Sequence, residues 1–158
     1  MTPGIAYEVV VTPTMLYLGE PYDSSDARLL LVAIGCQESA FKTRRQLHGP
    51  ARGFWQFEKR GGCDEFARLA SIKPFRDAAR ELAFKTDAES TYVALAEGAD
   101  VLACLMARAI LWPNPRPLPA RGEIDAAFTY YEQVWRPGKP SRARWTSSYA
   151  TACEIVPP

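Results

Sequence analysis

Residues 25–58 read SDARLLLVAIGCQESAFKTRRQLHGPARGFWQFE and decide the fold of the chain. The residues from Asp23 to Asp26 supply candidate N-cap side chains and negative charge for the first turn of a helix. The uninterrupted apolar run from Leu29 to Ile34 predicts that this helix is buried on most of its sides. Glu38 follows the run, so we expect its carboxyl group to lie against an apolar helical stripe.

The position of Glu38 predicts a carboxyl group with altered acidity. Leu31 and Ile34 share its helical face, because residues four and seven apart lie on one stripe. Loss of hydration disfavours the charged form of a carboxylic acid and raises its pKa. A carboxyl group that keeps its proton near neutral pH can protonate a poor leaving group such as a glycosidic oxygen. We therefore interpret Glu38 as a candidate general acid.

The second part of the stretch predicts an irregular or β-hairpin segment on the surface. Residues 42–52 are rich in basic side chains and include a glycine and a proline. The cluster 53–57 follows, in which Gly53 allows a close backbone approach, Trp55 offers a flat apolar face and Gln56 an amide. This combination suits the binding of sugar rings. The structural alternative is a plain corner of the core, packed with aromatic residues.

Two motifs in this stretch resemble those of the soluble lytic transglycosylases, which are relatives of goose-type lysozyme. Residues 38–41, Glu-Ser-Ala-Phe, are similar to the family's catalytic Glu-Ser motif, and residues 53–57, Gly-Phe-Trp-Gln-Phe, to its Gly-Leu-Met-Gln-type motif. The resemblance implies a mainly α, lysozyme-like fold and cleavage of the glycan strand of peptidoglycan. It further implies that Glu38 is the acid/base, Ser39 a positioning hydroxyl group and Gln56 a substrate-contacting amide.

A later segment predicts a tyrosine beside the candidate acid. The family carries an Ala-Tyr-Asn-type motif there, and residues 127–131, Ala-Phe-Thr-Tyr-Tyr, are a loose counterpart without the asparagine. Tyr131 is the first choice for the tyrosine in the cleft and Tyr130 the second. The missing asparagine leaves the substrate subsites and the reaction outcome open. Residues 135–140, Trp-Arg-Pro-Gly-Lys-Pro, are similar to a pattern in small bacteriophage proteins with such domains.

The number of carboxyl groups at the site separates two reactions. Glycosidases that hydrolyse their substrate use two, about 5 to 5.5 Å apart in retaining enzymes and about 6.5 to 9.5 Å apart in inverting ones. The family that the motifs resemble needs only one, because the N-acetyl oxygen and the 6-hydroxyl group of the substrate do the rest. Glu58 and Asp64 are candidates for a second, water-activating carboxylate that would make the chain a muramidase. The alternative is that both are surface or helix-start acids.

Two functions without catalysis fit the same residues. A lysozyme-fold virion structural protein would retain the cleft without activity, and the absent asparagine favours it. A binding module would use Trp55 to hold a glycan without cutting it. The presence of both the Glu38-Ser39 pair and the 53–57 cluster favours the enzyme.

Composition and charge limit the class of protein. The chain has 158 residues, of which 47% are hydrophobic, so we expect one lysozyme-like domain over residues 1–158. A formal net charge of +1 gives no general attraction to nucleic acid. No apolar run approaches the roughly eighteen residues of a membrane span, so no transmembrane segment is expected. The four cysteines are widely separated and only one histidine is present, so no metal and no cofactor are expected.

The cellular location follows from the expected substrate. Residues 1–18, MTPGIAYEVVVTPTMLYL, lack the features of a secretory signal peptide. Because peptidoglycan lies outside the cytoplasmic membrane, we expect a protein made in the cytoplasm and delivered to the periplasm or cell wall by a virion or a lysis system. The expected partners are the glycan strand and other phage virion proteins.

The remaining segments predict further helices and one connector. Residues 1–11 are predicted as a short arm or strand. Helices are expected over residues 13–18, 64–71, 74–86, 89–112 and 123–135, with a last helix capped by Ser141. The helix over 89–112 is expected to be the longest and to form the centre of the core. The proline-dense residues 112–119 predict a stiff, extended connector.

Overall fold

The computed structural model describes residues 1–158 and is mainly helical, which confirms the prediction of a mainly α fold. Its elements are α1 (Pro3–Ala6), a π-helical turn (Tyr7–Val11), α2 (Thr12–Leu18), α3 (Ser25–Ser39), a second π-helical turn (Lys59–Cys63), α4 (Asp64–Leu69), α5 (Lys73–Glu81), α6 (Ala88–Ala96), α7 (Asp100–Leu111), α8 (Ile124–Trp135) and α9 (Arg142–Ile155). The segment after α3 forms no strand and has only isolated bridges, Arg45 to Arg52 and Arg52 to Phe57. It is an irregular loop.

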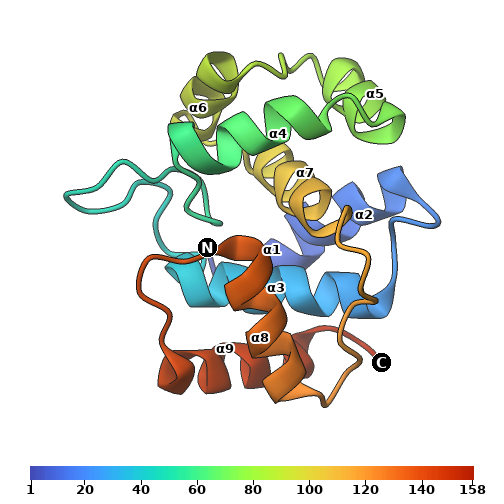
Figure 1. Ribbon diagram of the computed structural model, residues 1–158, viewed down its shortest axis with the longest axis vertical. Coiled ribbons are helices and arrows are strands. Elements are labelled where there is room, and N and C mark those ends of the chain that lie inside the picture. The colour runs from blue at the N-terminus through green and yellow to red at the C-terminus, as the bar shows by residue number, and fades with distance from the viewer.

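Helix α7 lies between two groups of helices (Figure 1). One group consists of α4, α5 and α6, and the other of α1, α2, α3, α8 and α9. Helices α3 and α9 pack side by side, and α7 contacts helices of both groups. One cluster of 37 buried residues draws on every helix, so the two groups share a single core. None of the helices combines the length and the hydrophobicity that a membrane crossing requires.

Helix α3 forms as its sequence predicts. The Ser24 hydroxyl group caps it by accepting a hydrogen bond from the Ala27 N–H group at 3.1 Å. Every residue from Leu29 to Gln37 is buried, which confirms a helix covered on most of its sides. The helix ends because Ala40 and Phe41 both adopt left-handed backbone conformations, with φ of 51° and 54°. Such angles are uncommon outside glycine, and they turn the chain sharply just after Glu38.

Gly35 makes this turn possible. A Cβ atom at Gly35 would lie 2.2 Å from the Cζ atom of Phe41, so the phenyl ring occupies the place of the missing side chain. Phe41 is fully buried and meets the rings of Phe54 and Trp55 edge-on, with centroids 5.4 and 5.5 Å away. The three aromatic rings therefore close over α3 where the chain reverses.

The prediction of an arm or strand over residues 1–11 is wrong. Helix α1 begins at Pro3, and the Thr2 hydroxyl group caps it by accepting from the Ile5 N–H group. Ala6 and Val10 are buried four residues apart, which is a helical spacing. Burial of this face outweighs the strand preference of the valines.

The predicted helix over 89–112 is also wrong, because the chain breaks within it. Gly98 has a φ of 97° and separates α6 from α7. The segment predicted over 74–86 forms a shorter helix that ends at Glu81, and Ala83 is left-handed with a φ of 59°. Apolar residues on both sides of Gly98 continue the helical period, so periodicity alone joins two helices into one.

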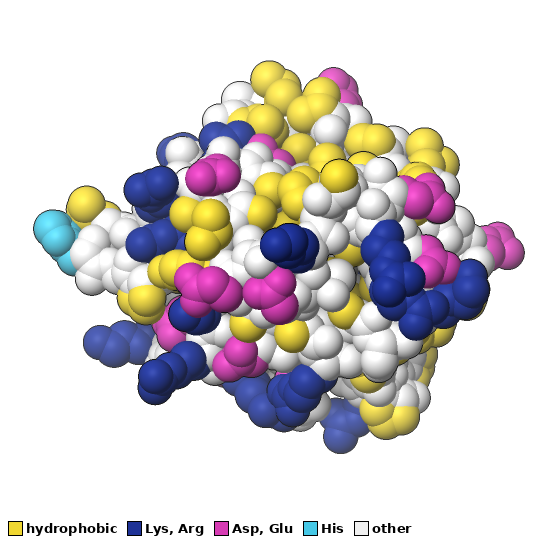
Figure 2. All heavy atoms as spheres, turned by 90° about the horizontal axis from the view of Figure 1, so that it is seen from above, with side chains coloured by type: hydrophobic (Ala, Val, Ile, Leu, Met, Phe, Trp, Pro, Cys, Tyr) yellow, Lys and Arg dark blue, Asp and Glu magenta, His cyan; other side chains and the backbone are white.

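Basic and acidic side chains are intermixed on the surface over α4, α5 and α6. Figure 2 shows this face, on which Lys and Arg groups alternate with Asp and Glu groups and with apolar atoms. This mixture agrees with a formal net charge close to zero.

We expect Gly35→Ala to lower the free energy of unfolding by about 1–3 kcal/mol, because the added methyl group overlaps the Phe41 ring. Urea denaturation measures the change. Gly4→Ala is the matched control, since nothing lies within 4 Å of a Cβ atom there. The double variant Gly35→Ala/Phe41→Leu should lose less than the sum of the two single variants. Strictly additive losses would contradict the contact.

Candidate functional site

Glu38 and Tyr131 meet where α3 ends and α8 passes it. Glu38 lies in the last turn of α3 and is partly buried. The Tyr131 hydroxyl group donates a hydrogen bond to Oε1 of Glu38 at 2.8 Å. The structure thus brings together the candidate acid and the tyrosine that was the first choice from the sequence.

Trp145 in α9 fixes the direction of the Tyr131 hydroxyl group. The two rings are stacked, with centroids 4.9 Å apart and planes 17° from parallel. Trp145 is fully buried, and its indole N–H group donates to the Ile124 carbonyl oxygen at 3.3 Å. The sequence analysis did not predict this role of Trp145. The signal that could have indicated it is an aromatic residue on the inner face of the last helix.

The surroundings of Glu38 favour its protonated form. Burial raises the pKa of Glu38, while the hydrogen bond from Tyr131 and the positive charge of Arg144 oppose this shift. Arg144 reaches the end of α3, where its Nη2 atom donates to the Cys36 carbonyl oxygen at 3.4 Å. Burial and the neighbouring Glu38 charge also raise the pKa of Tyr131, so its hydroxyl group remains a donor.

Cys36 does not act as a nucleophile in this setting. Burial raises the pKa of its thiol to about 11, so the reactive thiolate is scarce at neutral pH. All four cysteines are unpaired, and Cys36, Cys63 and Cys104 are buried. Cys153 is half-buried. No group of three or more His, Cys, Asp or Glu side chains is placed to hold a metal ion.

Ser39 connects the end of α3 to the loop that follows. Its hydroxyl group donates to the Phe54 carbonyl oxygen at 2.7 Å and accepts from the Phe41 N–H group at 3.1 Å. Only 6% of the residue is exposed. Its hydroxyl group therefore positions the loop, which is the role that the motif resemblance implies for Ser39.

Trp55 is a core residue and does not form a substrate wall. It is fully buried, and its indole N–H group donates to the Leu31 carbonyl oxygen at 3.0 Å. The prediction of an exposed flat face is wrong because the chain reversal at Ala40 and Phe41 turns this segment back onto α3. The alternative, a corner of the core packed with aromatic residues, describes Trp55 correctly.

Gly53 and Gln56 shape the same loop from inside. Gly53 has a φ of 72°, and its close approach is to Leu95 and Ala103, whose side chains lie 3.4 Å from a Cβ position there. The predicted approach of Gly53 to substrate is therefore wrong. The side-chain amide nitrogen of Gln56 donates to the Gly53 carbonyl oxygen at 2.7 Å. The backbone of Gln56 is left-handed, with a φ of 53°. Gln56 remains half-buried, so part of its amide reaches the surface.

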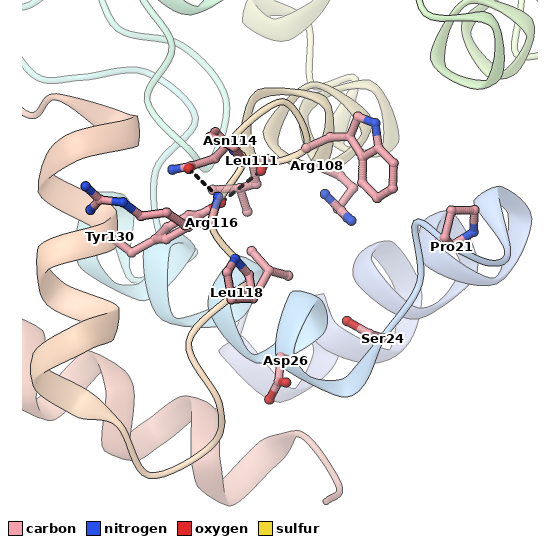
Figure 3. A pocket seen from close by; sticks show the side chains of 12 residues that line it. Pro21, Ser24, Asp26, Arg108, Leu111, Asn114, Arg116, Leu118 and Tyr130 are labelled. Atoms are coloured by element: carbon pink, nitrogen blue, oxygen red, sulfur yellow. Dashed lines mark hydrogen bonds between the residues drawn. The ribbon is translucent and has the colours of Figure 1, made fainter.

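Tyr130 points away from Glu38. Its hydroxyl group donates to the Leu111 carbonyl oxygen at 2.9 Å, and only 5% of the residue is exposed (Figure 3). Neighbouring residues on a helix project in different directions, so only one of the two tyrosines can face the acid. The second choice from the sequence is thus wrong.

Glu58 and Asp64 lie outside the contacts of Glu38. Both are exposed, and Asp64 stands in the first turn of α4 as a helix-start acid. The one side-chain hydrogen bond to the Glu38 carboxyl group comes from Tyr131. The basic segment 42–52 is also anchored: Arg44 donates two hydrogen bonds to Asp100, at 2.8 and 2.6 Å. This ion pair between the loop and α7 was not predicted from the sequence.

The arrangement of Glu38 and Tyr131 has the features that a general acid requires. A partly buried carboxyl group has one oxygen held by Tyr131, and the other is left for a reacting atom. In comparisons with known proteins, no family model, no curated protein and no solved structure matches the chain. The geometry around Glu38 therefore carries the functional inference.

We expect Tyr131→Phe to raise the pKa of Glu38 further, because it removes a hydrogen bond that stabilises the carboxylate. An NMR titration of the Glu38 side-chain carbon measures the shift. Tyr130→Phe is the matched control, since its hydroxyl group bonds to Leu111 and not to Glu38. Equal effects of the two variants would show that the hydrogen bond to Glu38 is absent in solution.

We expect Glu38→Gln to gain stability relative to the wild type as pH rises from the ordinary carboxyl pKa of 4.5 towards neutrality. The raised pKa means that ionisation of Glu38 opposes folding. This penalty is absent below the unfolded-state pKa and complete above the folded-state pKa. Denaturant unfolding over this pH range measures the difference, with Glu58→Gln as the control for loss of an exposed charge. A difference that stays constant with pH would contradict a raised pKa.

Proposed function

We propose that the chain cleaves the glycan strand of peptidoglycan between N-acetylmuramic acid and N-acetylglucosamine, as a lytic transglycosylase. The observation that carries the proposal is the pairing of Glu38 with Tyr131 at the buried end of α3. Burial keeps a proton on Glu38 at a higher pH than on an exposed glutamate. The resemblance of residues 38–41 and 53–57 to the motifs of lytic transglycosylases supports this substrate class.

In the proposed mechanism Glu38 first donates its proton to the glycosidic oxygen as that bond breaks. The N-acetyl oxygen of the substrate assists departure of the leaving group. The carboxylate then takes a proton from the 6-hydroxyl group of the sugar, whose oxygen closes a 1,6-anhydro ring. Glu38 thereby regains its proton, and Tyr131 stabilises the carboxylate between the two transfers.

The motif resemblance favours this mechanism over hydrolysis, because the family needs one catalytic carboxyl group and Glu38 is the one that stands in a motif and beside Tyr131. A muramidase that hydrolyses the same bond is the alternative reaction. It requires Glu58, Asp64 or another carboxylate to activate water.

The arrangement of helices supports the proposed lysozyme-like fold and a single domain over residues 1–158. Helix α3 packs against α7, and both contribute to one core shared by all the helices. In this proposal the chain acts in the periplasm or cell wall. A phage virion or a lysis system delivers it there, which makes other virion proteins its partners.

A structural protein of the virion is the second candidate function. The observation that favours it is the complete burial of Trp55, whose indole ring is part of the core and is not available to hold a sugar ring. Such a protein would keep the Glu38–Tyr131 pair without cutting glycan. Activity on purified peptidoglycan separates the two functions.

We expect the wild type to release muropeptides that are lighter by one water than hydrolytic products, and Glu38→Gln to lower the rate by about 10²–10⁴-fold. Mass spectrometry of digested peptidoglycan identifies the products, and circular dichroism checks that the variant is folded. Glu58→Gln and Asp64→Asn are the matched controls and should retain activity. Full-mass reducing ends, with loss of activity in one control, would indicate a muramidase. A folded wild type that releases nothing, alone and in assembled particles, would favour the structural protein.

A further inference from the structure

A cavity of about 610 Å³ is lined by Tyr130 of α8 and not by Glu38 (Figure 3). Its walls come from the start of α3, the end of α7, the connector 112–119 and Tyr130 of α8. This volume falls within the range of small-molecule sites, about 300–1,000 Å³. The function proposed above does not use this cavity.

Arg108 places a buried cation in the wall of the cavity. Only 3% of the residue is exposed, and its Nε atom donates to the Tyr22 carbonyl oxygen at 2.7 Å. Its Nη1 atom is buried without any hydrogen-bond partner. Buried polar atoms are nearly always paired, so this guanidinium group lacks acceptors within the folded chain.

No acidic residue neutralises this charge. Asp23 acts on Arg108 only through space, because its two carboxylate oxygens accept hydrogen bonds from Arg28 at 2.7 and 2.6 Å. Burial lowers the pKa of Arg108 to about 10, which leaves the side chain charged at neutral pH. The Trp112 ring, 5.1 Å from the guanidinium carbon, offsets part of the cost of burying the charge.

The guanidinium group projects into the space enclosed by Pro21, Ser24 and Leu118 (Figure 3). Three prolines, Leu111 and Leu118 give these walls apolar surface, beside the polar side chains of Ser24, Asn114 and Arg116. A planar guanidinium matches the two oxygens of a carboxylate, and the apolar surface favours a ligand with an apolar body. Asp26 and Arg116 also line the cavity with opposite charges, so one positive charge, that of Arg108, is left for a ligand with a single negative charge.

We propose that this cavity binds a small organic monocarboxylate whose carboxylate group pairs with Arg108. The apolar body of the ligand packs against the prolines of the connector 112–119. The ligand thereby supplies the counter-charge that the folded chain does not provide for Arg108.

Isothermal titration calorimetry of the full chain with sodium benzoate, at constant ionic strength in chloride, tests the proposal. We expect saturable binding at one site, and affinity at least about tenfold lower for Arg108→Gln, because a charged partner is removed. Arg80→Gln is the matched control, since Arg80 is exposed on α5 outside the cavity. Its affinity should equal that of the wild type.

Three further measurements keep the proposal testable if Arg108→Gln does not fold. Benzamide, which has the same body without the charge, should bind the wild type far more weakly than benzoate. Asp26→Asn should bind benzoate more tightly, because it removes a repelling charge. Inorganic phosphate should bind more weakly than benzoate. The proposal would be overturned if benzamide bound as tightly as benzoate, or if phosphate bound more tightly. It would also be overturned if benzoate did not bind, which would show that the cavity holds water only.

Discussion

Every residue of α3 from Leu29 to Gln37 is buried, so neighbouring elements must cover the helix on nearly every side. Helix α9 packs along it, α7 contacts it, and Trp55 closes it from the loop by donating to the Leu31 carbonyl oxygen. That hydrogen bond requires the loop to return immediately after the helix ends. The left-handed residues Ala40 and Phe41 make the return, and Gly35 leaves room for it.

The environment of Glu38 is a consequence of the burial of α3. The carboxyl group stands at the last turn of a covered helix, where the partial negative charge of the helix end also disfavours a carboxylate. Tyr131 and Arg144 act in the opposite direction, yet burial dominates and the pKa remains raised.

The sequence of residues 25–39 was sufficient to predict α3, because an apolar run behind an N-cap has few other structures open to it. The pairing of Glu38 with Tyr131 was also predictable, since the motif resemblance named both residues. The direction in which the Trp55 side chain points could not be predicted. A glycine followed by aromatic residues has the same composition in a binding wall and in a core corner, and only the turn at Ala40 decides between them. The break at Gly98 escaped detection for a related reason, since the apolar period continues on both sides of it.

Two neighbouring tyrosines of helix α8 make hydrogen bonds to two different helices. Tyr131 binds Glu38 of α3, and Tyr130 binds the Leu111 carbonyl oxygen at the end of α7. Because adjacent helical residues point in different directions, these two hydrogen bonds tie α8 to two different helices. A helix anchored at both hydroxyl groups cannot rotate without breaking one of them. The Tyr131 donor is thereby fixed in place before any substrate arrives, and a preorganised donor costs no reorientation when charge develops on Glu38.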